Sequence, residues 1–369
     1  MKYVDEFRNP KLVNKIAARI SAINPGNNIN IMEVCGTHTQ NFFRFGLDKL
    51  LPGNIKLISG PGCPVCVSPQ EYIDSAIELA KKKDVIIATF GDMLRIPGRS
   101  SSLEKEKARS ANVRVVYSPL DAITLAAANL DKRVIFLAVG FETTAPTIAL
   151  SILAAQNEKL KNLYFFSALK LIPPAMRHLL LDKRLKIDAF LCPGHVSAII
   201  GTKDYEFIPQ KYKKACCIAG FEPVDILEGI YMILEQIIAN KPYVANQYTR
   251  IVTPAGNLKA GKIINRVFKV RNSAWRGFGV IAESGLGLKK EFSDFDAERL
   301  GNASTFLAIS KGKVEASPLT QCRCADILKG LFQPADCILF NKSCRPDNPI
   351  GPCMVTNEGA CNTYYKFRG

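Results

Sequence analysis

The chain has 369 residues, 47% of them hydrophobic, and a formal net charge of +16 at pH 7. This length predicts two or three domains with an ample core. The basic residues are dispersed, with no arginine stripe and no recognition motif, so the charge indicates solubility and attraction to acidic partner proteins, and we expect no binding to nucleic acid. No apolar run approaches the roughly 20 residues of a membrane helix, and the charged N-terminus lacks the apolar region of a secretory signal. The sequence therefore predicts a soluble cytoplasmic protein without membrane contact.

Short apolar runs followed by helical patterns recur between residues 30 and 240, which predicts parallel sheets joined by crossover helices. We expect eight strands, at Asn30–Val34, Ile55–Ser59, Val85–Phe90, Val113–Tyr117, Arg133–Val139, Leu163–Ala168, Ala189–Cys192 and Ala215–Ala219. The two halves can be laid over each other, since Val34–Thr39 aligns with Val139–Thr144 and a Pro-x-Asp triplet follows each at nearly equal spacing. This favours two copies of one four-stranded unit.

The predicted fold class is α/β, with two similar parallel-sheet domains facing a cleft and a third, α-rich or irregular domain. The first domain spans residues 28–120 and the second spans residues 121–241. Near residues 241–253 the strand and helix rhythm breaks, and prolines and glycines follow. We therefore assign residues 242–369 to the third domain, together with residues 1–27, which contain a predicted helix at Lys11–Ser21.

Reactive side chains follow the predicted strands of the first domain, where the carboxyl ends of parallel strands form sites. Cys63 and Cys66 form a C-x-x-C pair before a helix, an arrangement that lowers a thiol pKa and allows a disulfide to close and reopen. Cys35 also precedes a predicted helix, so we expect its thiol pKa to be lowered too. It is unpaired in its loop and is therefore free to bind a metal or attack an electrophile. His38 lies three residues further on, close enough to share a ligand or assist a proton transfer, although a lone histidine is more often structural.

The second domain offers two further candidates at strand exits. Glu142 follows the strand at 133–139 and His195 follows the strand at 189–192. Both would face the same cleft as Cys35 if the two domains oppose each other, and we expect them to contact a bound cofactor there. Helix capping is the alternative role for Glu142.

Six cysteines occupy the last 48 residues, namely Cys322, Cys324, Cys337, Cys344, Cys353 and Cys361. Their spacing contains no C-x₂₋₄-C knuckle and no histidine, which makes a zinc site a poor match. Four thiolates complete an iron–sulfur cluster, and the remaining two would form a disulfide beside it. A zinc site and a set of purely structural bridges remain the alternatives, although a reducing cytoplasm disfavours the bridges.

Together these motifs resemble the HypD family of hydrogenase maturation factors, and the resemblance covers essentially the whole chain. The motifs that carry it are Cys35-Gly36-Thr37-His38, Gly60-Pro61-Gly62-Cys63-Pro64-Val65-Cys66, Gly140-Phe141-Glu142-Thr143-Thr144-Ala145-Pro146, Cys192-Pro193-Gly194-His195 and the six C-terminal cysteines. The presence of all five motifs in this order is specific to this family.

The resemblance implies a scaffold that assembles the Fe(CN)2CO unit of nickel–iron hydrogenases with a HypC-like chaperone and a HypE-like cyanide donor. It implies a 4Fe-4S cluster held by Cys322, Cys337, Cys344 and Cys361, and a disulfide between Cys324 and Cys353. Cys35 would hold the transient Fe(CN)2CO iron, since thiolates suit ferrous iron that carries cyanide and carbon monoxide. The chain alone is expected to be a monomer.

The expected activity is that of a metallocofactor-assembly scaffold with thiol–disulfide and iron–sulfur redox chemistry. Its reactive residues would be Cys35, His38, Cys63, Cys66, Cys324 and Cys353. An alternative from another class is an iron–sulfur thiol–disulfide oxidoreductase that acts on protein disulfides. A structural zinc scaffold is a third interpretation.

Overall fold

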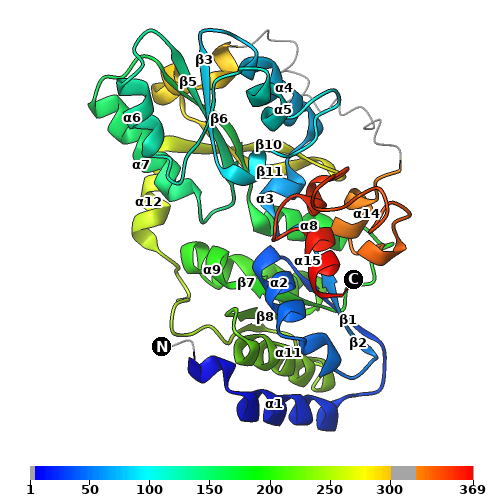
Figure 1. Cartoon of the computed structure of the whole chain (residues 1–369). Coiled ribbons are helices and arrows are strands. Elements are labelled where there is room, and N and C mark those ends of the chain that lie inside the picture. Colours follow the sequence, from blue (N-terminus) through cyan, green and yellow to red (C-terminus); the bar gives the residue numbers. More distant parts are fainter. Residues whose placement is uncertain (1–4, 301–320, 369) are drawn as a thin grey trace.

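The computed structural model describes residues 5–300 and 321–368. It shows two lobes, each built on a parallel sheet with helices around it (Figure 1). Strands form at all eight predicted places: β1 (Ile29–Glu33), β2 (Ile55–Ser59), β3 (Val85–Thr89), β4 (Val113–Val115), β5 (Arg133–Gly140), β6 (Leu163–Leu169), β7 (Ala189–Pro193) and β8 (Ala215–Ala219). The prediction of an α/β fold with parallel-sheet domains is therefore confirmed.

The strands are distributed between the sheets differently from the prediction. The first sheet has the order β2-β1-β7-β8-β9, where β9 spans Val244–Asn246, and the second has the order β4-β3-β5-β6. The prediction of two contiguous four-stranded copies is wrong, because β1 pairs with β7 and β3 pairs with β5. Each of the segments 28–120 and 121–241 thus supplies strands to both sheets. The sequence of an apolar strand shows that both of its faces are buried, but it does not show which strands pair with it.

Helices connect the strands and cover the sheets. In chain order they are α1 (Pro10–Ile23), α2 (Gly36–Arg44), α3 (Pro64–Val67), α4 (Gln70–Ala80), α5 (Leu103–Ala108), α6 (Asp121–Ala127), α7 (Ala145–Asn157), α8 (Ile172–Leu181), α9 (Gly194–Ile200), α10 (Phe207–Tyr212), α11 (Pro223–Ile238), α12 (Leu258–Val267), α14 (Cys324–Leu328) and α15 (Ala360–Phe367). An antiparallel hairpin of β10 (Phe268–Trp275) and β11 (Gly279–Leu288) packs on β6 and α8. Within residues 5–300 and 321–368, no helix is both long and apolar enough to cross a lipid bilayer.

The N-terminal helix packs within the first lobe. α1 lays its apolar face on α11, and Val13, Ile16 and Ile20 are buried in the same cluster as Ile230. The sequence grouped this helix with residues 242–369. A periodic apolar face identifies a helix with a buried side, but it does not identify the surface on which that side rests.

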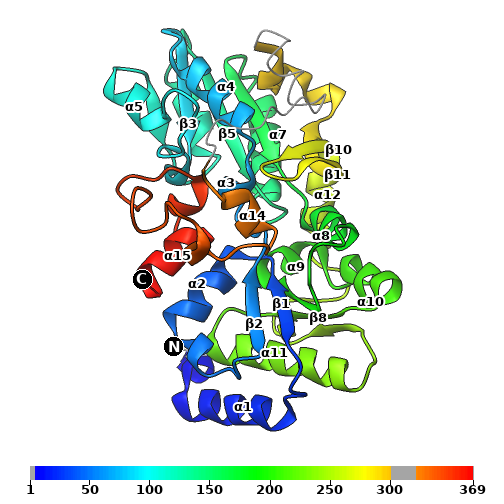
Figure 2. The same ribbon diagram turned by 90° about the vertical axis from the view of Figure 1, so that its right-hand side faces the viewer.

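The two lobes share one continuous core. A single cluster of buried side chains includes Val139 of β5, Cys192 of β7, Cys66 of α3, Trp275 of β10 and Ile327 of α14. The C-terminal segment, coloured orange to red, lies at this junction in both views (Figure 2). The carboxyl ends of strands from both sheets therefore meet at one packed junction, which we call the waist.

A buried ion pair supports one loop of the waist. Asp225 at the start of α11 is fully buried, and its two carboxylate oxygens accept hydrogen bonds from Arg250 at 2.8 and 2.6 Å. Gln247 donates a further hydrogen bond to Asp225 at 2.9 Å. The network is joined to the loop at Gly220, since the backbone amide of Gly220 donates a hydrogen bond to the side chain of Gln247 at 3.1 Å.

We expect Arg250→Ala to lower the free energy of unfolding by about 3–5 kcal/mol, because the carboxylate of Asp225 would stay buried without its cation. The measurement is a urea unfolding curve of the purified protein. The matched control is Arg266→Ala, which removes an exposed ion pair with Glu291 and should cost less than about 1 kcal/mol. Equal losses in the two variants would contradict the importance of the buried pair.

Candidate functional site

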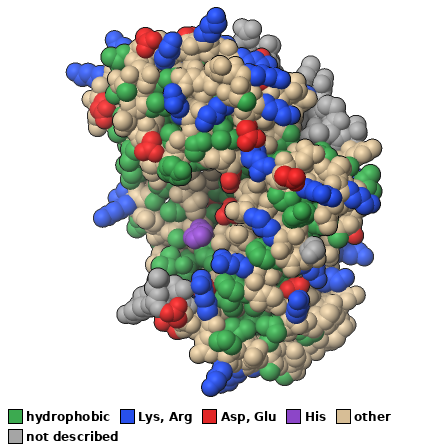
Figure 3. All heavy atoms as spheres, in the orientation of Figure 1, with side chains coloured by type: hydrophobic (Ala, Val, Ile, Leu, Met, Phe, Trp, Pro, Cys, Tyr) green, Lys and Arg blue, Asp and Glu red, His purple; other side chains and the backbone are tan. Residues whose placement is uncertain are grey.

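The loops that leave the carboxyl end of the first sheet carry most of the predicted site residues. Cys35 follows β1, Cys63 follows β2 and His195 follows β7. Because parallel strands point the same way, their exits lie along one edge of the sheet. The backbone amide of Gly36 donates to the carbonyl of Gly62 at 3.1 Å, which joins the first two loops directly. Figure 3 shows a hollowed region between the lobes with a histidine and acidic side chains at its wall.

Cys35 caps the N-terminus of α2 in an extended conformation. Its thiol is buried, and this burial raises the pKa of Cys35 to about 12, with the nearby carboxylates of Glu358 and Glu33 adding to the effect. The expectation of a low thiol pKa at this position is therefore wrong, because desolvation outweighs the favourable end of a short helix. The thiol stays neutral unless a cation reaches it.

A buried acid and a half-buried acid, Glu33 and Glu358, border Cys35, and the sequence analysis selected neither of them. Glu33 accepts hydrogen bonds from the amide of Cys35 at 3.0 Å and from the hydroxyl of Thr39, and burial raises its pKa to about 8. Glu358 accepts from the hydroxyl of Thr37 at 2.9 Å, and burial raises its pKa as well. The sequence could have indicated Glu33 as a site residue, since it is a charged residue at the end of an otherwise apolar strand. No such indication existed for Glu358, because it comes from the distant C-terminal segment.

Cys63 and Cys66 lie together in the first turn of α3. Their sulfurs are 2.6 Å apart, and the amide of Cys66 donates to the sulfur of Cys63 at 3.2 Å. The pair is thus at a distance from which a disulfide closes with little movement. Both side chains are buried, and this burial, followed by the proximity of Cys63, raises the pKa of Cys66 well above its usual value. The lowered thiol pKa predicted for this motif is not found at Cys66.

A second sulfur pair lies beside the first. Cys324 and Cys353, the two that the family resemblance pairs, are joined as a disulfide with their Cα atoms 6.2 Å apart. The sulfur of Cys66 is 3.9 Å from the carbonyl oxygen of Pro352, the residue before Cys353. The first pair therefore lies against the segment that carries Cys353.

The remaining C-terminal thiols surround one another. Burial raises the pKa of Cys361 well above its usual value, and the sulfurs of Cys322, Cys344 and Cys337 raise it further. The amide of Ile350 donates to the sulfur of Cys344 at 3.4 Å. Among the described residues, no three Cys, His, Asp or Glu side chains converge on a single-ion site.

Two observations test whether this set fits an iron–sulfur cluster. The thiols of Cys322, Cys344 and Cys337 lie near enough to raise the pKa of Cys361, and four thiolates are the donor set that such a cluster requires. A Cβ at Gly351 would lie 2.5 Å from the sulfur of Cys322, so glycine keeps space free beside that sulfur. The residues present therefore fit the group in donor chemistry and in room.

The two histidines of the site share an aromatic neighbour. The ring of His38 lies 4.8 Å from the ring of Phe221, and the ring of His195 stacks on Phe221 at 3.9 Å. His38 donates through Nε2 to the carbonyls of Gly220 and Ala219, its Nδ1 is buried without a partner, and burial lowers its pKa to about 4. His38 is therefore neutral, with a free lone pair on Nδ1. Phe221 was not predicted from the sequence.

Glu142 lies between β5 and α7, and its side chain reaches the first residue of α8. Its Oε1 accepts from the amide of Ile172 at 2.8 Å, whereas its buried Oε2 has no partner. Burial raises the pKa of Glu142 to about 8. In the described part of the chain, no hydrogen bond or ion pair links Glu142 or His195 to Cys35.

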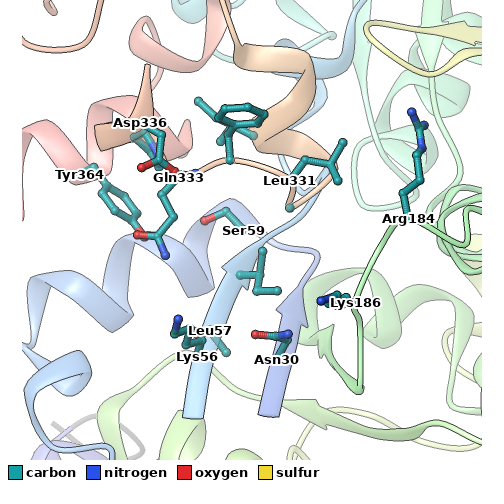
Figure 4. A pocket seen from close by; sticks show the side chains of 15 residues that line it. Asn30, Lys56, Leu57, Ser59, Arg184, Lys186, Leu331, Gln333, Asp336 and Tyr364 are labelled. Carbon is teal, nitrogen blue, oxygen red and sulfur yellow. Dashed lines mark hydrogen bonds between the residues drawn. The ribbon is translucent and has the colours of Figure 1, made fainter. Parts of the chain in front are cut away.

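A separate pocket of 330 Å³ opens along the outer edge of β2 (Figure 4). Lys56 and Lys186 lie on one side of it, and Leu331 and Gln333 of the C-terminal segment lie on the other. None of the residues predicted to be functional lines this pocket.

Comparisons with known proteins find relatives that match this chain over its whole length. The HypD family model, described as "Hydrogenase formation hypA family", matches residues 11–368. The hydrogenase maturation factor HypD of Azotobacter vinelandii is 44% identical over 100% of this chain and 97% of its own length. The factor of the same name from Escherichia coli K12 is 44% identical over 100% of this chain and 98% of its own length. The hydrogenase expression/formation protein HupD of Azotobacter chroococcum is 45% identical over the whole chain.

We expect Gly62→Ala to disrupt the site, because a Cβ at this position would overlap the backbone nitrogen and Cα of Cys35. The loops of Cys35 and Cys63 would have to separate, and the variant should lose about 2 kcal/mol or more of stability, as overpacking of a buried site does. The control is Gly53→Ala, where a Cβ meets no atom within 4 Å. Chemical unfolding and the spontaneous oxidation of the Cys63–Cys66 pair measure the two effects. Identical behaviour of both variants would contradict the close approach.

Proposed function

Because the chain belongs to the HypD family of hydrogenase maturation factors, we propose that it is the scaffold on which the Fe(CN)2CO unit of nickel–iron hydrogenases is assembled. The observation that carries this proposal is the chain of sulfurs through the waist, from the Cys35 loop through Cys63–Cys66 to Cys324–Cys353 and the four C-terminal thiols. The assembly would take place in the cytoplasm, where thiols are kept reduced. A HypC-like chaperone and a HypE-like cyanide donor would be its partners.

Cys35 is the proposed ligand of the iron that serves as substrate. Its thiol is neutral in the free protein, so binding of iron would displace the proton and create the thiolate at that moment. A thiolate is a suitable electron-rich ligand for ferrous iron that is to hold cyanide and carbon monoxide. The second thiolate would come from the chaperone, because the nearby pair at Cys63 and Cys66 is already engaged with itself.

Glu142 and His195 would hold the ligands of the iron across the cleft. With a pKa of about 8, Glu142 keeps its proton at neutral pH. Its unpartnered Oε2 then carries a hydroxyl that can donate to the nitrogen of a bound cyanide. His195 is exposed, so it is accessible to an incoming group.

The cysteine pairs would carry reducing equivalents toward this site. A 4Fe-4S cluster held by Cys322, Cys337, Cys344 and Cys361 would supply single electrons when bound. The disulfide at Cys324 and Cys353 exchanges with Cys63 and Cys66, so that one S–S bond forms as the other breaks. Their placement on either side of Pro352 supports such an exchange.

Burial argues against the alternative of an oxidoreductase that reduces protein disulfides. Cys63 and Cys66 are 3% and 0% exposed, and Cys324 and Cys353 are 4% and 0% exposed. Exchange needs direct contact between sulfurs, which a folded partner protein would not achieve at such positions. Internal transfer to a small bound group is the better match.

The proposal predicts a division among the six C-terminal cysteines. Alanine at Cys322, Cys337, Cys344 or Cys361 should remove most of the iron and acid-labile sulfide and the visible absorption of the anaerobically purified protein, because a four-iron cluster needs four thiolates. Alanine at Cys324 or Cys353 should leave both unchanged. Equal loss in all six variants would refute the assignment.

Cys35→Ser is expected to abolish hydrogenase maturation while the fold remains, because a hydroxyl binds ferrous iron far more weakly than a thiolate. Infrared spectra of the purified complex measure this, since cyanide and carbon monoxide absorb where protein does not. Cys217→Ala is the control, because this buried β8 thiol contacts only its own lobe. Intact cyanide bands in Cys35→Ser would rule out Cys35 as the ligand.

A further inference from the structure

Arg276, in the turn between β10 and β11, is tied to the segment that carries Cys66. Its amide donates to the carbonyl of Val67 at 2.8 Å, and its Nε donates to the carbonyl of Ser68 at 2.9 Å. Its Nη1 donates to Oε1 of Gln70 at 2.8 Å. These three bonds place the guanidinium directly after the Cys63–Cys66 pair.

The next residue of the same turn rests on the other sulfur pair. Gly277 has a φ of +82°, and a Cβ there would overlap the Cβ of Ala325, the residue after Cys324. Figure 1 and Figure 2 both show the hairpin beside α3 and α14 at the waist. The turn therefore contacts the residue that follows Cys66 and the residue that follows Cys324.

No carboxylate of the described residues forms an ion pair with the guanidinium of Arg276. Its Nη2 is buried without a hydrogen bond. Burial lowers the pKa of Arg276, whereas the sulfurs of Cys322 and Cys66, followed by the carboxylates of Glu71 and Asp74, act in the opposite direction. A buried cation without a carboxylate is costly, and such a group is stabilised whenever a nearby sulfur becomes negative.

We propose that Arg276 is a positioning residue that stabilises the negative charge formed on sulfur when the pairs Cys63–Cys66 and Cys324–Cys353 exchange. The inference rests on the exchange route of the proposed function. It assigns an electrostatic role to the hairpin turn, which takes no part in the exchange route described above.

The chemistry balances within the two pairs. Cys66 gives up its proton and its sulfur attacks the sulfur of Cys353, so that a mixed disulfide forms as the Cys324–Cys353 bond breaks. Cys324 leaves as a thiolate beside the turn and then takes a proton. Cys63 attacks next and releases Cys353, which takes a proton, so two electrons and two protons have moved to the Cys324–Cys353 pair. The same steps in reverse deliver them to Cys63–Cys66, which is the direction that supply from a cluster to the Cys35 site requires. The transition state spreads one negative charge over three sulfurs, and the fixed cation lowers its energy.

The experiment follows exchange in the full-length protein purified anaerobically. The oxidised protein is mixed with dithiothreitol, samples are quenched with N-ethylmaleimide, and mass spectrometry reports when each pair becomes alkylated. Arg276→Gln should slow the transfer from Cys63–Cys66 to Cys324–Cys353 about tenfold, because a neutral side chain removes the charge. Arg276→Lys should stay within about threefold of the wild type, because the charge is kept although the forked hydrogen bonds are lost.

Comparison of these variants separates the possible outcomes. A purely structural tether would make lysine as slow as glutamine, which would overturn the inference, as would an unchanged rate in Arg276→Gln. Arg271→Gln on the same hairpin is the matched control, because Arg271 binds Ser167 and Glu298 instead of the sulfur pairs and should leave the rate unchanged. Absence of transfer in the wild type would overturn the exchange route itself. Thermal unfolding of each variant checks that the fold is retained.

Discussion

Desolvation of sulfur is the constraint on which the chemistry of the waist depends. A thiol taken out of water keeps its proton, because the low-dielectric interior penalises the thiolate more than a helix end favours it. Burial raises the pKa values of Cys35, Cys66 and Cys361 for this reason. The site therefore needs a cation at each place where a thiolate must form. Iron would be that cation at Cys35 in the proposed function, and the guanidinium of Arg276 is a fixed cation that interacts with the sulfurs of Cys322 and Cys66.

The strand order explains how so many sulfurs become buried together. Because β1 and β2 pair with β7 and β8 while β3 and β4 pair with β5 and β6, the chain crosses between the lobes several times. Each crossing passes through the waist and fills it with backbone and side chains. A protein made of two contiguous units would join them by a single linker and leave such a junction open to water.

The sequence predicted local features well and remote ones poorly. The eight strands and the Cys63–Cys66 pair depend on neighbours within a few residues, and they lie where the pattern placed them. The partner of each strand, and the approach of Glu358 to Thr37, depend on segments that lie far apart in the chain. The thiol pKa values were mispredicted for the same reason, since a helix end can be read from the sequence and the depth of burial cannot.

Backbone contacts, more than side-chain reach, fix the distances between the sulfurs. The Cys35 loop is held to the Cys63 loop by the bond from Gly36 to Gly62, and the α3 segment is held to the hairpin by the bond from Arg276 to Val67. Main-chain hydrogen bonds of this kind leave little freedom to the residues beside them. The sulfur of Cys66 therefore reaches the Cys353 segment without a movement of one lobe relative to the other. Delivery of iron to Cys35, as the proposed function requires, would need the protein to open there, because that thiol is buried, whereas Cys66 already lies against the Cys353 segment.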